Sequence, residues 1–182
     1  AEDGIRDKLV TGVQTCALPI YPTKTFMELG RSCILPVYRS RRTLEIMWQG
    51  TWAYARDNHV DIMIGCASFP GTDTSEFESE ISLLASHAPL TSDWQVQAVS
   101  MQARKVGILP KHKFDPKTVI RRLPPLVKGY LKLGAMFSNE IVIDEAFNTT
   151  DILVVLQVNA INPRYIRYYG EDAGRYRHSD NA

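Results

Sequence analysis

An amphipathic helix that follows directly on a group of arginines is the feature that most constrains this fold. Between residues 42 and 57, largely apolar side chains recur at spacings of three and four, at Leu44, Met47, Trp48, Thr51, Trp52 and Ala55. This spacing places them on one helical face, which must pack against a sheet. A loosely alternating apolar segment, residues 24–35, precedes the helix, and a short apolar run, residues 59–69, follows it. A strand on each side of one helix predicts a βαβ unit, in which the two strands are parallel.

The arginines stand at the amino end of this helix, where the helix dipole is already positive. Each additional cation is unfavourable there by about 0.3–1 kcal/mol. An anion held by the free N–H groups of the first turn would make the arrangement favourable. The sequence therefore predicts a phosphate site made by Arg39, Ser40, Arg41, Arg42 and Thr43. A solvated arginine cluster, with side chains directed away from the helix axis, explains the same pattern equally well.

The composition is that of one ordinary folded domain, which we place at residues 21–170. The chain has 182 residues, 45% of them hydrophobic, and a net charge of +1. Its charges are segregated: residues 57–93 hold seven acidic and no basic side chains, whereas residues 104–132 hold nine basic side chains and one acidic. Such a basic block can attract nucleic acid, an anionic membrane surface or an acidic protein, or it can be a solvated face.

Several classes of protein do not fit the sequence. No apolar run approaches the roughly 18 residues that a membrane-spanning helix needs. The three cysteines form no close pair, so we expect neither a disulfide framework nor a zinc site, and no other metal site is predicted. A reducing, cytoplasmic location is therefore the expectation.

The two ends of the chain are expected to lie outside the domain. Residues 1–20 show neither helical nor strand periodicity, and residues 10–20, VTGVQTCALPI, resemble a translated sequencing adapter. We therefore treat residues 1–20 as a non-native segment, so that the natural chain would enter near Tyr21. Residues 171–182 form a polar tail.

The remaining periodicities predict an α/β fold (α+β) with a mixed, partly parallel sheet flanked by helices. Helices are expected from about residue 74 to 88, over 116–123, and from 125 to about 137. Strands are expected over residues 94–99, 141–144 and 151–158, the last of them central because it is almost wholly apolar.

Residues 36–44, PVYRSRRTL, resemble motif A of the GNAT acyltransferase superfamily. In that motif, backbone N–H groups hold the pyrophosphate of an acyl-pantetheine carrier. Where the motif has glycine, this chain has Ser40, Arg42 and Leu44, whose side chains fill space that a coenzyme A diphosphate would take. The resemblance thus favours the branch that uses acyl carrier protein. Residues 28–31, ELGR, are also similar to the E-x-[ST]-R of the acyl-homoserine lactone synthases in that branch.

Two longer blocks, residues 28–73 and 123–156, resemble the L-ornithine Nα-acyltransferases, the hemolysin-like proteins that make lyso-ornithine lipid, within a likeness covering residues 26–170. The resemblance implies a GNAT-type sheet without its first strands. It also implies transfer of a 3-hydroxyacyl group from acyl carrier protein to the α-amino group of L-ornithine. The donor would be the carrier's acyl-phosphopantetheine, and no cofactor would be bound permanently.

Roles for individual residues follow from that reaction. Glu28 is the candidate base, or else an ion-pair partner of Arg31, which would position substrate or support Glu28. A backbone N–H near Ile34 would stabilise the oxyanion. Cys66 and Ser68 could face the gap between the first two strands, Cys66 more as a core residue than as a nucleophile, so direct transfer is expected.

The basic block would dock the acidic carrier protein or the anionic membrane surface, with the protein held peripherally at the inner membrane face and binding no nucleic acid. Its candidate docking residues are Arg121, Arg122, Lys128 and Lys132. Two other functions fit the sequence: an N-acetyltransferase that uses acetyl-CoA, and a non-catalytic, membrane-associated binding protein.

Overall fold

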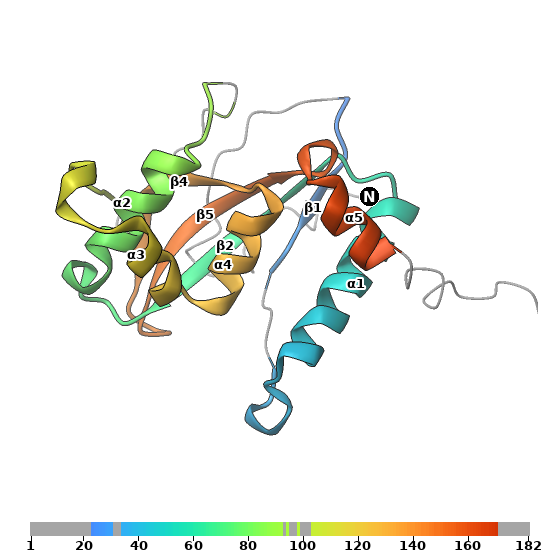
Figure 1. The fold of residues 1–182 in the computed structure, drawn as a ribbon, viewed down its shortest axis with the longest axis horizontal. Helices are drawn as coiled ribbons and strands as arrows, with labels where there is room; N and C mark the ends of the chain where they lie inside the picture. The colour runs from blue at the N-terminus through green and yellow to red at the C-terminus, as the bar shows by residue number, and fades with distance from the viewer. Residues whose placement is uncertain (1–22, 31–33, 93, 95–97, 99–102, 171–182) are drawn as a thin grey trace, which may run out of the picture.

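The computed structural model describes residues 23–30, 34–92, 94, 98 and 103–170 (Figure 1). Its strands form one five-stranded sheet in the order β1-β2-β5-β4-β3. The strands are β1 (Phe26–Glu28), β2 (Ile62–Pro70), β3 (Ala103–Lys105), β4 (Met136–Asp144) and β5 (Thr149–Gln157). β1 and β2 are parallel, and the other neighbours are antiparallel. The predicted mixed, partly parallel sheet with a central last strand is confirmed.

The helices gather on one face of this sheet (Figure 1). In the described ranges they are α1 (Arg41–Asp57), α2 (Glu78–His87), α3 (Pro116–Arg122), α4 (Pro125–Leu133) and α5 (Pro163–Gly170). Short 3-10 turns lie at Pro36–Tyr38, Thr74–Phe77, Lys111–Lys113 and Val158–Ala160. No helix in these ranges has the length and apolar character that crossing a bilayer requires.

The main core lies between the helices and the sheet because successive strand side chains point to opposite faces. The face under the helices carries alternate residues of β2 and β5, all buried: Met63, Ala67, Phe69, Ile152, Val154 and Leu156. A smaller cluster occupies the other face, formed by Ile62, Trp94, Leu153 and Val155. The apolar stripe predicted for α1 faces the main core: Trp48 and Trp52 pack against it and Ala55 is fully buried, which confirms the βαβ prediction.

Two predicted boundaries are wrong. The helix expected to reach residue 137 ends at Leu133, because Gly134 adopts the left-handed conformation with φ 93° and β4 begins at Met136. The strand expected over residues 24–35 is only three residues long, Phe26–Glu28.

Two further differences lie elsewhere in the chain. α5 was not expected; Asn162 begins it by accepting a hydrogen bond from the Arg164 N–H (2.9 Å). Most of the strand predicted over residues 94–99 falls outside the described residues, and β3 lies outside every strand predicted from the sequence.

Candidate functional site

β1 and β2 separate at a close contact between their backbones. Glu28 is the last residue of β1 paired with β2, opposite Ile64, and the Leu29 N–H donates to the Ile64 carbonyl oxygen (2.7 Å). A β-carbon on Gly65 would stand 2.6 Å from the Leu29 carbonyl oxygen, so only glycine fits there. The described ladder between the strands ends at this point, whereas β2 continues to Pro70 against β5. The sequence predicts a gap between the first two strands, which would open from this point; residues 31–33, which follow, lie outside the described residues.

A small cavity, here called the entry cavity, lies beside the end of this pairing. Its volume is about 30 Å³, and its walls come from the end of β1, from α1 and from α4: Leu29, Leu44, Met47, Trp48, Thr51, Leu126 and Tyr130. The rings of Trp48 and Tyr130 meet edge to face, with centroids 5.1 Å apart. Burial raises the pKa of Tyr130 to about 12, so its hydroxyl stays protonated at neutral pH.

The predicted phosphate-binding residues lie together at the amino end of α1. Ser40 is the N-cap, and its Oγ accepts the Thr43 N–H (3.1 Å). The Arg39 Nε donates to the Ile34 carbonyl oxygen (3.0 Å), which ties this segment to the residues leaving β1. Arg41 pairs with Glu45 (2.9 Å) but remains largely exposed, and Arg42 is also exposed. The cluster is thus open to solvent, as both sequence-based interpretations require.

Glu28, Cys66 and Ser68 lie on the opposite face of the sheet from the entry cavity. Glu28 pairs in register with Ile64, and Cys66 and Ser68 follow Ile64 at alternate positions of β2, so all three point to the same side. Glu28 and Ser68 are exposed, and the Cys66 side chain is half-buried. The other predicted catalytic residue, Arg31, lies outside the described residues.

Ser68 has a structural partner. Its hydroxyl hydrogen-bonds the carboxylate of Asp151, the residue opposite it on β5. Burial raises the pKa of Asp151, against the lowering effect of hydrogen bonds from Ser68 and Thr149, and the nearby Asp144 charge raises it further.

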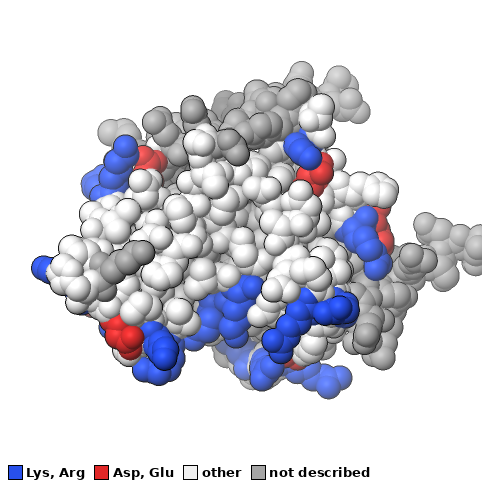
Figure 2. All heavy atoms as spheres, turned by 45° about the horizontal axis from the view of Figure 1, so that its top comes forward, with Lys and Arg blue, Asp and Glu red and all other residues white. Residues whose placement is uncertain are grey.

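The predicted docking residues differ in what they contact. The Arg122 Nε pairs with the buried Glu80 carboxylate (2.9 Å), Lys128 Nζ donates to the Arg121 carbonyl oxygen (2.9 Å), and Arg121 donates to the Thr118 hydroxyl (3.0 Å). Lys132 is exposed. Figure 2 shows Lys and Arg side chains gathered along one side of the molecule with few Asp or Glu among them.

Sequence reasoning missed two features of the site. It gave no role to Gly65, whose backbone lies in close contact with Leu29; a glycine inside an apolar strand was the available signal. It placed Trp48 only in the packing face of the helix and gave Tyr130 no role, because their contact joins helices far apart in the chain.

Within the described ranges, no group of three His, Cys, Asp or Glu is placed to hold a metal ion.

The mixed five-stranded sheet and its βαβ unit, flanked by helices, are consistent with a GNAT-like fold. Comparison with curated proteins is more specific. The chain is 47% identical over 156 residues to an L-ornithine N(alpha)-acyltransferase of Rhizobium meliloti and 46% identical over 155 residues to one of Agrobacterium fabrum. A more distant protein of the same name, from Rhodobacter capsulatus, is 27% identical over 146 residues.

These matches confirm the resemblance to the L-ornithine Nα-acyltransferases and show how much of each chain the resemblance covers. The matches to the first two relatives cover 86% and 85% of this chain, but 53% of each relative, so the chain spans about half their length. No family model matches the chain, and no solved structure matches it.

Proposed function

We propose that this chain is the acyl-transferring part of an L-ornithine Nα-acyltransferase. It would move a 3-hydroxyacyl group from acyl carrier protein to the α-amino group of L-ornithine, giving lyso-ornithine lipid. The observation that carries the proposal is the 47% identity over 86% of the chain to a protein of that name. The strand gap next to the arginine-rich end of α1 is compatible with that chemistry.

The donor is proposed to approach from the helix side of the sheet. Its pantetheine phosphate would rest at the amino end of α1, held by backbone N–H groups and by the guanidinium groups of Arg39, Arg41 and Arg42. Ser40 and Thr43 would line the same site. The thioester would then reach the strand gap through the entry cavity, which begins one helical turn further along α1, at Leu44.

The acceptor is proposed to approach from the opposite face, where Glu28 lies. The neutral α-amino nitrogen attacks the thioester carbonyl carbon, the C–N bond forms and the C–S bond breaks. Glu28 accepts the amine proton, directly or through water, and the departing pantetheine thiolate takes up a proton to become a thiol. A backbone N–H near Ile34 stabilises the oxyanion. Transfer is direct, with Cys66 and Ser68 lining the gap and Arg31 orienting the substrate.

The same proposal covers location and partners. The exposed basic residues would dock acidic carrier protein, and the protein would work peripherally at the cytoplasmic face of the membrane that receives the product.

Purified protein supplied with hydroxyacyl carrier protein and L-ornithine tests the proposal, with lyso-ornithine lipid measured by mass spectrometry. Glu28→Gln is expected to lower kcat roughly 100-fold, because it removes the proton acceptor. Arg42→Ala is expected to raise KM for the carrier about tenfold, because it removes a phosphate contact.

Arg56→Ala is the matched control for Arg42→Ala, since Arg56 is a partly exposed arginine at the other end of the same helix. It should leave KM for the carrier unchanged. Transfer from acetyl-CoA but not from the carrier would contradict the proposed donor. Carrier binding without turnover of any amine would favour a non-catalytic binding protein.

A further inference from the structure

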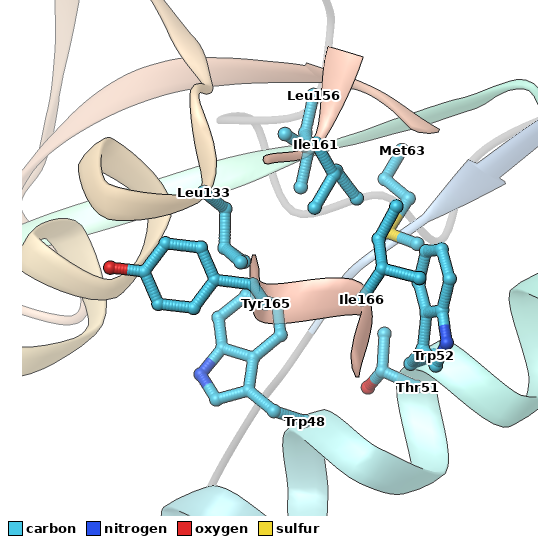
Figure 3. A pocket seen from close by; sticks show the side chains of 9 residues that line it. All are labelled: Trp48, Thr51, Trp52, Met63, Leu133, Leu156, Ile161, Tyr165 and Ile166. Carbon is cyan, nitrogen blue, oxygen red and sulfur yellow. The ribbon is translucent and has the colours of Figure 1, made fainter. Parts of the chain in front are cut away.

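A second cavity lies on the same inner face of α1, beneath α5 (Figure 3). We call it the inner cavity; its volume is about 20 Å³. α1 contributes Trp48, Thr51 and Trp52 to its walls, and α5 contributes Tyr165 and Ile166. Figure 3 shows these side chains turned toward one another, with Met63, Leu133, Leu156 and Ile161 completing the enclosure.

The two cavities adjoin along α1. Trp48 and Thr51 are walls of both, while Leu44 belongs only to the entry cavity and Trp52 only to the inner one. Because these positions share one helical face, the cavities follow each other along the helix axis. Trp48 and Thr51 therefore lie at the boundary between the two cavities.

Trp48 rests on a surface that lets it lie flat. A β-carbon on Gly129 would stand 3.6 Å from atoms of the indole, and Tyr130 meets the ring edge to face. These residues of α4 contact the indole directly, and the indole also packs against the main core. Turning the side chain about its own bonds would join the two cavities without breaking the backbone hydrogen bonds of α1.

The inner cavity is suited to hydrocarbon. Its walls are aliphatic and aromatic apart from the Thr51 hydroxyl and the polar tips of the Tyr and Trp rings. A polar ligand would lose its hydrogen bonds to water there, whereas an alkyl chain would gain by leaving water. Each cavity has room for only one or two water molecules, so an alkyl chain must displace Trp48 or lift α5 to enter.

We propose that the entry and inner cavities are one acyl-chain channel, in which Trp48 is the gate and Ile166 sets the length of chain accepted. The thioester end lies in the entry cavity, next to the arginine-rich start of α1, and the hydrocarbon tail runs past Trp48 to end beneath α5. Only the identification of the ligand as an acyl donor depends on the proposed function.

Binding is tested without turnover, using fatty acids that carry bromine near the end of the chain, since bromine quenches indole emission only at short range. The chain has three tryptophans, and Trp94 belongs to the cluster on the opposite face of the sheet, so it serves as an internal reference. We expect quenching in the parent protein and in Trp94→Phe. We expect it to be lost in the double variant Trp48→Phe with Trp52→Phe. Equal quenching in that double variant, or none in the parent, would overturn the channel.

Chain length is tested with a pair of changes at one position. Ile166→Trp should shift the preference toward shorter fatty acids, and Ile166→Ala should shift it toward longer ones. The affinity should change by about fourfold for each methylene group that the cavity no longer holds or newly holds. General destabilisation cannot produce opposite shifts. The same two substitutions at Ile46, on the exposed side of α1, are the control and should leave the preference for chain length unchanged. Unchanged length preference in both Ile166 variants would contradict the assignment.

The results separate the channel from the proposed reaction. Bromine quenching with opposite length shifts but no acyl transfer to ornithine would leave the channel standing and remove the proposed function. Acyl transfer with no quenching of Trp48 or Trp52 would support the function and remove the channel.

Discussion

The carbonyl oxygen of Leu29 lies 2.6 Å from the position that a β-carbon on Gly65 would occupy. This contact lies at the point where the described pairing between β1 and β2 ends. Because the obstructing atom is backbone, it cannot move aside as a flexible side chain would. We expect Gly65→Ala to lower the free energy of unfolding by about 1–3 kcal/mol, the usual cost of overpacking. Urea denaturation followed by circular dichroism measures it.

Gly50→Ala is the matched control for this prediction. Gly50 lies within α1, and a β-carbon there meets no atom within 4 Å. Alanine is the better helix former, so this substitution should raise the free energy of unfolding by about 0.5–1 kcal/mol. If both alanine variants changed stability in the same direction, the close contact at Gly65 would not be the cause.

The ion pair between Glu80 and Arg122 makes a second prediction. The Glu80 side chain is 4% exposed and that of Arg122 57% exposed, and the pair joins α2 to the end of α3. Arg122→Met leaves a buried carboxylate unpaired, and we expect it to destabilise by about 2 kcal/mol after allowance for solvent around the arginine. The double variant Arg122→Met with Glu80→Gln should recover part of this loss of stability, which thermal unfolding of the parent and the variants would measure. Additive losses would contradict the coupling.

A third prediction concerns docking, which Arg122 cannot test cleanly because it also supports the fold. Lys132 is exposed at the end of α4, so its charge can be reversed with little effect on packing. We expect Lys132→Glu to weaken binding of acidic carrier protein by about three- to tenfold at low salt, and less at high salt, as calorimetry would show.

Lys24→Glu provides the comparison for Lys132→Glu, since Lys24 is a partly exposed lysine that lies near β1 and pairs with Asp61 (3.4 Å). It carries the same charge change outside the basic block, and should leave carrier binding nearly unchanged. An equal effect of both variants would mean that net charge, and not this surface, governs the association.

Much of the fold was predictable because its signals are local. The apolar stripe of α1 identified the packed helix, and the apolar run over residues 151–158 identified the central strand β5. The start of β4 was missed because the apolar residues around Met136 fit a helix or a strand equally well. Gly134, in the left-handed conformation, was the signal for the boundary. α5 was missed although Asn162 and Pro163 are typical of a helix start.

The candidate site was predictable only where its residues are neighbours in the sequence. Arg39, Ser40 and Thr43 lie close together in the sequence around the N-cap of α1, so a linear motif could reveal them. The contact of Trp48 with Tyr130 depends on how α4 lies across α1, and no periodicity in either helix encodes the angle at which they meet. The same holds for the cavities, which arise where α1, α4 and α5 converge on the sheet.

The last prediction concerns Asp151, whose carboxylate is buried beside Ser68, with its Oδ1 making no hydrogen bond to any described residue. Burial raises its pKa above the ordinary 3.8. The folded state therefore holds this proton more tightly than the unfolded state. As pH rises from 3.8 through the raised pKa, the folded state alone remains protonated, so this group's contribution to stability falls and then stays low.

Asp151→Asn removes this cost while it keeps an acceptor oxygen for Ser68 and Thr149. We expect the variant to gain roughly 1 kcal/mol of stability relative to the parent at about pH 7, and less at about pH 3, where the parent carboxyl is protonated in both states. Urea denaturation of both proteins across this range measures the difference. Ser68→Ala should widen the gap between parent and Asp151→Asn near neutral pH, because it removes a hydrogen bond that supports the ionised form. A gain from Asp151→Asn that is larger at acid than at neutral pH would show that the carboxylate is stabilised, and not penalised, by its position in the sheet.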